Sequence, residues 1–505
     1  MRREPNSLAH GLFDLLVIGG GITGAGVALD AAQRGWRVAM VDKGDFASAT
    51  SSASSKLVHG GLRYLERGRV GLVYESLSER RRLLRNAPHL VKPLRFILPF
   101  YRNSRMPRWK GRIGLWLYDL LAGSHNMGRS RDLSALRLQR SFPALRSSGL
   151  IGGAEYFDAQ MDDARLCLEV VQTAANWGAN VSNYVEAIAF DLSGEKEGEV
   201  HLRDRLNGQV IAVRAKQVLN ATGPWVDSLR RLAGEKEAGP ELQPTKGVHV
   251  IVSGRPYAAG GEPRSFDTAF TLLHPHDGRV FFVLPWMGQT LLGTTDTFCD
   301  ETADALIVTP AEEQYLLDGY NFYFQPALDR KEIRGRFAGL RPLLRSKSDD
   351  PSARSREFRI IEGPRQLLSV AGGKWTTYRH MAELITDRIG NRLGSVRKCH
   401  TAKLLLDGTP KMPWNLFAPS EIAKIAADFG WGDSLAGHLV NRYGRRACDV
   451  AGVIRERNET QPVVAGEPDA IGEWEYQRRE EMAMRREDHL LRRSRLGMWH
   501  GELLT

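Results

Sequence analysis

The sequence predicts an α/β protein with a doubly wound parallel sheet, a second β-rich layer over it and a helical C-terminal domain. Three observations support this fold class. An apolar strand, a Gly-x-Gly-x-x-Gly turn and a helical pattern follow one another near the N-terminus. Two later apolar strands also run out into glycine turns. Beyond about Thr401 the sequence becomes charged, with helical patterns.

The first unit has the pattern of a turn that binds the ADP half of a dinucleotide. Gly19 permits the tight turn, Gly21 lets the backbone approach a pyrophosphate, and Gly24 lets the helix pack closely on the strand. A second strand ends in Asp42, 18 residues after Gly24, where a carboxylate can accept hydrogen bonds from the adenosine ribose. The nucleotide-binding candidates here are Gly19, Gly21, Ile22, Thr23, Gly24 and Asp42.

Small and hydroxyl-bearing residues fill the stretch from Ala47 to Gly61, which we call the serine segment. Alone it could be a flexible linker. It begins a few residues after Asp42, however, where a doubly wound fold must bring the chain back across its cofactor, so we favour contact with a flavin. The candidates are Thr50, Ser51, Ser52, Ser54, Ser55, Lys56, His59, Gly60 and Gly61.

Two further strands end in small-residue turns. The strand from Gln217 runs into Ala221, Thr222 and Gly223, after a charged, hairpin-like stretch at 195–213. The strand from Leu367 runs into a second set of candidates, which opens a helical pattern and consists of Gly372, Gly373, Lys374, Trp375 and Thr376. Ligands of α/β sheets bind at such strand ends, so one cofactor domain is predicted from three separate stretches of chain.

The remaining segments fit a substrate layer and a cap. Strand-like Val248–Val252, a hairpin at 279–293 and a helical pattern at 310–323 belong to the layer. The predicted bounds are 13–95, 156–245 and 339–395 for the three parts of the FAD-binding domain, 96–155 for a substrate or cap segment, 246–338 for the substrate domain and 400–505 for the helical domain.

Composition is that of a globular enzyme, with 42% hydrophobic and 26% charged residues in 505. The longest apolar runs are far too short to cross a bilayer, and no signal peptide is evident. We therefore expect a cytoplasmic protein. Its four cysteines form no Cys-x-x-Cys pair, which argues against a zinc site, an iron–sulfur cluster or a disulfide framework.

The formal net charge of +11 favours anionic partners: nucleic acid, acidic phospholipid or a phosphorylated substrate. No nucleic-acid fold signature accompanies it. Many arginines are expected on solvated helix faces, as at 80–82 and 492–495. Segment 102–118 mixes cations with apolar residues and two tryptophans, and it suits either a lipid headgroup boundary or a core helix with a basic flank.

Five motifs resemble, in order, those of the aerobic FAD-dependent glycerol-3-phosphate dehydrogenases: Thr50–Glu66, Asn220–Trp225, Gly293–Asp296, Gly339–Pro342 and Gly372–Arg379. The resemblance runs from about Phe13 to Trp499. It implies a D-amino-acid-oxidase-type flavoprotein of the bacterial kind that oxidises sn-glycerol 3-phosphate to dihydroxyacetone phosphate by hydride transfer to flavin N5. Electrons would pass to ubiquinone or another membrane quinone, which implies peripheral attachment to the inner (cytoplasmic) membrane. Members are often dimers, so a homodimer is compatible. Asp42 stands where such enzymes usually have glutamate.

The same chemistry assigns roles to cations and to one histidine. Arg63 and Arg341 follow glycine turns and can grip a phosphate. Lys374 would donate to the substrate hydroxyl or to the ring, and Tyr64 would close the pocket wall. The ordinary histidine pKa near neutrality suits His249 as general base, although Lys374 or a water could do that work.

Two other functions stay open at this stage. The same fold and substrate could serve a glycerol-phosphate oxidase that uses dioxygen. A basic lipid- or nucleic-acid-binding protein with a purely structural nucleotide is the alternative from another class.

Overall fold

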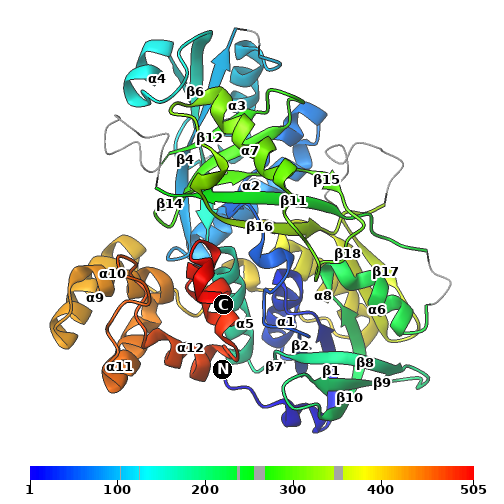
Figure 1. Ribbon diagram of the computed structural model, residues 1–505. Helices are drawn as coiled ribbons and strands as arrows, with labels where there is room; N and C mark the ends of the chain where they lie inside the picture. Colours follow the sequence, from blue (N-terminus) through cyan, green and yellow to red (C-terminus); the bar gives the residue numbers. More distant parts are fainter. Residues whose placement is uncertain (103, 124–125, 236–238, 255–267, 346–356, 505) are drawn as a thin grey trace.

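The computed structural model describes the chain except residues 103, 124–125, 236–238, 255–267, 346–356 and 505, and except the side chains of Arg63, Glu66 and Arg67. Two sheets and a C-terminal helical domain make up the molecule (Figure 1). Short helical turns join the larger elements at Pro5–Ala9, Thr50–Ser52, Leu62–Arg67, Gly223–Trp225, Arg330–Glu332, Thr401–Lys403, Gly444–Arg446, His489–Arg493, Leu496–Met498 and Gly501–Leu504.

Within the described residues the first sheet has eight strands in the order β17-β18-β10-β1-β2-β7, with β9 and β8 extending from β10. The central pairs β18–β10, β10–β1, β1–β2 and β2–β7 are parallel. Its strands are β1 Leu12–Ile18, β2 Val38–Val41, β7 Asn180–Ser182, β8 Val185–Asp191, β9 Gly198–Asp204, β10 Val210–Asn220, β17 Phe358–Glu362 and β18 Leu367–Gly372. Three separated stretches of chain supply this sheet, as the glycine turns predict.

Helices α1 (Ile22–Gln33), α5 (Asp163–Asn176) and α8 (Tyr378–Leu393) pack side by side against one face of this sheet. Side chains of β1 alternate between two cores, because Leu15 and Val17 join the cluster under the helices whereas Leu16 and Ile18 join the cluster on the other face. That second face is covered by β8, β9 and α6 (Val226–Leu232). The strand pattern is therefore that of a parallel sheet buried on both sides.

The described residues form a second sheet of ten strands, in the order β15-β11-β14-β13-β12-β4-β6-β3 with β16 on β11 and β5 on β6. Helices α2 (Val70–Asn86) and α3 (Arg108–Ala122) pack on one face, and α4 (Ala135–Ser141) and α7 (Pro310–Tyr323) on the other. Its strands are β3 Leu57–Val58, β4 Val91–Tyr101, β5 Arg131–Leu133, β6 Leu150–Met161, β11 Thr245–Val252, β12 Thr268–Leu273, β13 Val280–Trp286, β14 Gln289–Gly293, β15 Thr297–Phe298 and β16 Ile333–Arg341.

The C-terminal domain is helical, with its own core between α9 (Trp414–Phe429), α10 (Asp433–Tyr443) and α11 (Ala447–Arg457). After α12 (Glu473–Glu481) and α13 (Arg486–Asp488), the last stretch returns to α5 and β16, beside the N-terminus in Figure 1. It packs so tightly on β16 that a Cβ on Gly335 would lie 1.7 Å from the Met498 carbonyl oxygen. The domain bounds predicted above stay predictions.

The expectation that the arginines at 80–82 and 492–495 lie on solvated faces is wrong for four of them, whereas Arg81 is exposed as expected. Arg80, Arg493 and Arg495 are each 1% exposed or less, and Arg492 is 8% exposed, so they are not on solvated faces. Buried carboxylates surround them and compensate their charge.

Candidate active site

The three glycine turns meet at the carboxyl edge of the first sheet. Gly19 lies against the second turn, because a Cβ on it would be 2.5 Å from the Ala221 carbonyl oxygen. The third turn is joined to the serine segment by Trp375, whose Nε1 donates to the Ser51 carbonyl at 3.2 Å. The serine segment is joined in turn to β16, since the Thr50 hydroxyl donates to the Leu340 carbonyl at 2.7 Å. Five stretches of chain, the three turns, the serine segment and the end of β16, therefore enclose one space.

That space is a cavity of about 1180 Å³ between the two sheets. It exceeds the usual size of a pocket for a drug-sized ligand, which reaches about 1000 Å³. Most of the candidates named from the sequence line it: Gly19, Gly21, Ile22, Thr23, Asp42, Thr50, Ser51, Ser54, Ser55, His59, Gly61, Tyr64, Ala221, Thr222, Gly223, His249, Arg341, Gly372, Gly373, Lys374, Trp375 and Thr376.

Three candidates lie elsewhere or outside the described side chains. Gly24 is under the helix, where a Cβ would be 1.9 Å from the Gly19 carbonyl oxygen, so its part is the close packing expected of the third glycine. The Gly60 amide donates to the Tyr118 hydroxyl at 2.9 Å, away from the cavity. The side chain of Arg63 is outside the described residues.

Ser52 and Lys56 also stand off the cavity wall. The Lys56 ammonium is fully buried and donates to both carboxylate oxygens of Asp163, each at 2.9 Å, and to the Ser52 carbonyl at 2.5 Å. Burial lowers the pKa of Lys56 to about 8, although Asp163 opposes this. The Lys56 side chain thus turns away from the cavity and holds the serine segment from behind.

The nucleotide end of the cavity has donors and a carboxylate where a dinucleotide needs them. Helix α1 begins after Gly21, and its first amide, that of Ile22, donates to the Ser51 hydroxyl at 2.9 Å. The next N–H groups of the first turn have no partner within the helix and can face a phosphate. Asp42 accepts from the backbone amides of Gly20 at 2.7 Å and Gly44 at 2.8 Å, which fixes its orientation. Burial raises its pKa to about 6, against the lowering effect of those two amides.

His249 lies on β11 opposite Gly293 and Phe337. Its Nε2 is 2.8 Å from the Ser55 hydroxyl, and its ring stacks on Phe337 with centroids 4.8 Å apart. Burial holds its pKa well below the ordinary value, and the Arg341 and Lys56 cations add to this effect. The expectation of a pKa near neutrality is therefore wrong: the imidazole is neutral, and its lowered pKa makes it a weaker base than an ordinary histidine.

Arg341 is the last residue of β16 and lies beside the Gly293–Asp296 motif, to which the sequence assigned no role. Its Nη1 donates to Asp296 at 3.0 Å, and its Nη2 donates to the Thr294 hydroxyl at 2.8 Å. Gly247 makes room for it, because a Cβ there would be 2.4 Å from Nη2. These contacts fix the guanidinium in the cavity wall.

Lys374 and Tyr64 come together across the cavity. The Lys374 ammonium lies 4.1 Å from the centroid of the Tyr64 ring. Gly61, with φ +77°, lets this ring fold back, since a Cβ there would be 2.3 Å from the ring. Gly372 and Gly373 have φ +85° and +103°, values that favour glycine, so the turn can bring its backbone close to a ligand.

Three residues of the site carry no motif in the sequence. Arg279 lines the cavity and donates to the Asp296 carbonyl. Lys43 and Asp304 form an ion pair of 2.9 Å at the nucleotide end, where Lys43 also lies over the Trp225 ring at 3.8 Å. The position of Lys43 directly after Asp42 was a usable signal. Arg279 and Asp304 come from another layer and had none.

Comparison with known proteins agrees with this geometry. The model of the FAD-dependent oxidoreductase family matches residues 14–388, and the C-terminal domain of alpha-glycerophosphate oxidase matches residues 399–503. Aerobic glycerol-3-phosphate dehydrogenase from Staphylococcus saprophyticus is 36% identical over 494 residues, which cover 95% of this chain and 86% of the relative. The enzyme of that name from Staphylococcus aureus strain MRSA252 is 36% identical over 97% of this chain and 87% of its own.

Solved structures show the same fold. The glycerol-3-phosphate dehydrogenase from Bacillus halodurans, complexed with FAD, is 30% identical with a TM-score of 0.81 over 99% of this chain and 89% of its own. L-alpha-glycerophosphate oxidase from Mycoplasma pneumoniae, 17% identical, has a TM-score of 0.61 over 80% of this chain and 100% of its own, which is a likeness of fold. The cavity, its glycine turns and these matches agree on FAD as cofactor, and the chain belongs to the aerobic, FAD-dependent glycerol-3-phosphate dehydrogenases.

Proposed function

We propose that this protein oxidises sn-glycerol 3-phosphate to dihydroxyacetone phosphate and passes the electrons to a membrane quinone. FAD, when bound, supplies the two-electron acceptor for this oxidation. The protein must bind a phosphate, orient the C2 carbon and remove the proton of the C2 hydroxyl. His249, Arg341 and Lys374 line the cavity that the glycine turns enclose, and this observation supports the proposal most strongly.

The phosphate would be held by cations of the second sheet and of the third turn. Arg341 and Arg279 reach the cavity from β16 and from the start of β13, and both contact the 294–296 turn. Guanidinium groups bind phosphate through paired charge-assisted hydrogen bonds, and the Asp296 carboxylate keeps the Arg341 fork in one orientation. Lys374 adds a third positive group. This cluster predicts strong preference for a phosphorylated alcohol.

The proton would leave through Ser55 to His249. The hydroxyl of Ser55 is 2.8 Å from Nε2, and Ser55 lines the cavity. Burial and two nearby cations keep the imidazole neutral before the reaction, so it would act as a weak base that holds the proton only transiently. The resulting imidazolium would be costly beside Arg341 and Lys56, so it would return its proton to solvent readily.

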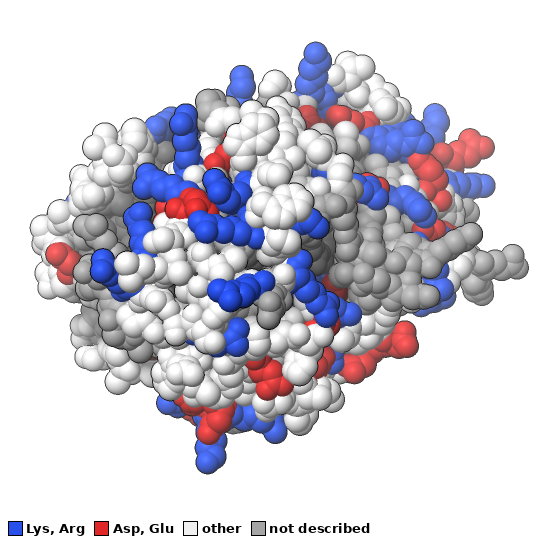
Figure 2. Space-filling model, turned by 90° about the horizontal axis from the view of Figure 1, so that it is seen from above, with Lys and Arg blue, Asp and Glu red and all other residues white. Residues whose placement is uncertain are grey.

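A lipid surface would be met by helix α3. Trp109, Ile113, Trp116 and Leu120 form one stripe along it and are 57–65% exposed, while Leu115 and Tyr118 on the opposite side are buried. Figure 2 shows the face at the top of Figure 1, which carries α3, with many Lys and Arg side chains among uncharged ones. Cations around exposed tryptophans suit anionic headgroups and would bring the cavity to membrane quinone. No helix within the described parts of the chain is both long enough and apolar enough to span a bilayer.

Anaerobic titration of the purified holoprotein tests the substrate. Glycerol 3-phosphate should bleach the flavin absorbance near 450 nm, and glycerol at the same concentration should not. A spectrum that neither compound changes would refute the proposal. Reoxidation of the reduced protein then tests the acceptor: a ubiquinone analogue should act faster than dioxygen, and the reverse order would mean a glycerol-phosphate oxidase.

A further inference from the structure

The end of the chain buries an unusual concentration of positive charge. Arg492, Arg493 and Arg495 are 8%, 0% and 1% exposed, although arginine is almost never fully buried unless it is paired. None of them lines the cavity, and the proposed chemistry does not use them. Each contacts an acidic residue outside the C-terminal domain.

Arg495 reaches the back of the serine segment through Asp163, the first residue of α5. Its Nη2 donates to the carboxylates of Asp162, at 2.8 Å, and of Asp163. Asp163 in turn accepts from the Ser54 hydroxyl at 2.6 Å and from the Lys56 ammonium. Two side-chain contacts therefore separate Arg495 from Ser54, which lines the cavity, and the next residue carries the hydroxyl that meets His249.

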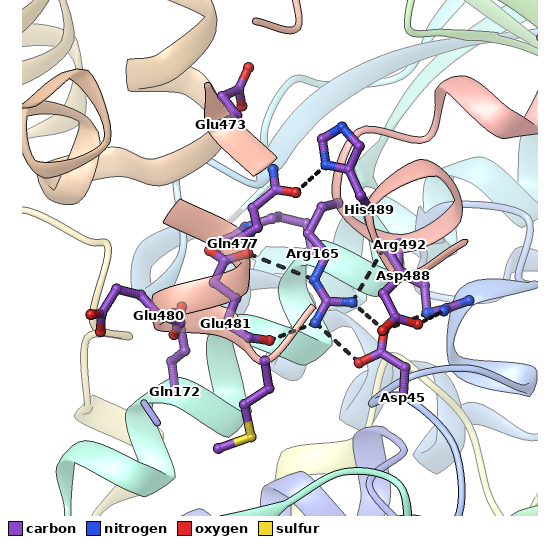
Figure 3. A network of polar contacts seen from close by, with 12 residues as sticks. Asp45, Arg165, Gln172, Glu473, Gln477, Glu480, Glu481, Asp488, His489 and Arg492 are labelled. Atoms are coloured by element: carbon purple, nitrogen blue, oxygen red, sulfur yellow. Dashed lines mark hydrogen bonds and ion pairs between the residues drawn. The ribbon is translucent and has the colours of Figure 1, made fainter. Parts of the chain in front are cut away.

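Arg492 and Arg493 hold the neighbouring loop in the same way. Figure 3 shows Asp45 and Asp488 directed toward one cluster of arginine side chains. Arg492 Nε donates to Asp45 at 2.6 Å, and Arg493 donates to both oxygens of that carboxylate. Asp45 lies between Asp42 and Ala47, both of which line the cavity. The C-terminal stretch thus contacts Asp45 and Asp163, which support two segments of the cavity wall.

Charge balance shows that these contacts depend on one another. Lys56 and Arg495 face Asp162 and Asp163, two cations against two carboxylates, and none of the four side chains is more than 9% exposed. Burial alone would raise the pKa of Asp163, but the Lys56 and Arg495 cations hold that pKa below its usual range. Without Arg495 the cluster would keep one negative charge in excess, and Asp163 would be pulled by Lys56 alone.

We propose that Arg495 is a positioning residue for FAD: through Asp163 it holds the serine segment in the shape that receives the cofactor. The C-terminal domain thereby completes the FAD site without touching it. This inference rests on FAD as the cofactor and does not depend on the substrate or on the quinone.

The test compares two charge-balanced double variants of the full-length protein. Arg495→Met with Asp162→Asn removes the brace and leaves the Lys56–Asp163 pair, and Asn can still cap α5. Arg34→Met with Asp30→Asn removes a comparably buried pair of 2.6 Å at the C-terminal end of α1, opposite to the end that contacts Ser51. Both double variants should lower the melting temperature.

Only the Arg495 double variant should change the cofactor site. Titration of the apoprotein with FAD should show a dissociation constant higher by about tenfold or more, and hydrogen exchange should speed up in residues 50–58. The visible circular dichroism of bound FAD should change as well. Arg495→Lys keeps a cation that can reach one of the two carboxylates, and it should fall between the wild type and the double variant even where the latter folds poorly.

An FAD affinity within twofold of the wild type in the Arg495 double variant, with unchanged exchange in residues 50–58, would overturn the proposal. Equal losses of FAD affinity in both double variants would also overturn it, because the effect would then be general destabilisation. Failure of the protein to oxidise glycerol 3-phosphate would leave these FAD measurements as informative as before.

Discussion

Replacing Arg341 by methionine separates phosphate recognition from catalysis. Methionine fills similar space without charge, so the variant removes the guanidinium that Asp296 and Thr294 hold in the cavity wall. If this group binds the substrate phosphate, the loss should fall on the phosphorylated substrate. The same change leaves Asp296 with 7% exposure and without this cation.

The structure sets the size of both effects. A hydrogen bond to a charged group contributes about 1.5–3 kcal/mol, so one lost bond to phosphate predicts a roughly 10- to 150-fold decrease in kcat/KM for glycerol 3-phosphate. The variant should also lose about 1–3 kcal/mol of folding stability, because the buried Asp296 carboxylate would no longer accept a hydrogen bond from Arg341. Adding Asp296→Asn removes that unpaired charge and should recover stability but not kcat/KM.

The assay follows reduction of a quinone analogue with glycerol 3-phosphate and with glycerol. Rates are taken on the alkaline plateau, because Arg341 lowers the pKa of His249 and its removal would shift the pH profile. Bound FAD should stay at one per chain. Equal losses for glycerol and glycerol 3-phosphate would show that Arg341 acts on the shape of the site and does not grip phosphate.

Three further changes test other parts of the reasoning. Gly24→Ala should abolish FAD retention, because the added Cβ would lie 1.9 Å from the Gly19 carbonyl oxygen. Gly71→Ala is the control and should retain FAD, because a Cβ there meets nothing within 4 Å. The visible absorbance of the purified proteins measures bound FAD, and a yellow Gly24→Ala protein would contradict the steric argument. The pKa of His249 is held below the ordinary 6.5, so below that pH the unfolded chain binds a proton that the folded chain does not. The free energy of unfolding should therefore fall as the pH drops below about 6.5, by up to roughly 1.4 kcal/mol per pH unit. Urea unfolding of His249→Asn should lack this part of the pH dependence, and identical slopes in variant and wild type would refute the argument. Trp116→Ser with Leu120→Ser should release the protein from anionic phospholipid vesicles in a sedimentation assay, whereas Leu416→Ser, equally exposed on α9, should not; retained binding would exclude the α3 stripe.

Local steric requirements made the cofactor end of the site predictable from sequence. A Cβ on Gly24 would clash with the Gly19 carbonyl oxygen within the same turn, so this requirement is local, whereas a Cβ on Gly19 would clash with Ala221 from the second turn. The convergence of the turns followed from a topological rule, because strand ends of one parallel sheet meet at one edge. Fold class and cofactor could therefore be predicted before any coordinates.

Long-range ion pairs could not be predicted in this way. Lys56 stands in the most specific motif, which suggested cofactor contact, but its partner Asp163 lies 107 residues later in the chain. Residues 492–495 have the composition of a solvated helix face, and only the position of Asp45 and Asp163 shows that they are buried. Charge pairing across domains has no periodicity that a sequence displays. The pKa of His249 differs from the expected value for the same reason, because it is lowered by burial and by two cations, Arg341 and Lys56, that are distant from it in the sequence.

The buried arginines are better explained by the way the C-terminal stretch docks on the rest of the protein than by a contribution to the free energy of unfolding. A buried ion pair contributes little net stability compared with apolar packing, because desolvation offsets the attraction, yet removal of one partner is strongly destabilising. Arg493 and Arg495 therefore favour the docking geometry that brings Asp45 and Asp163 within reach. Those two carboxylates belong to the loop after β2 and to the start of α5, which support the cavity wall. In our proposal, contacts from residues near the end of the chain therefore hold the FAD cavity in its shape.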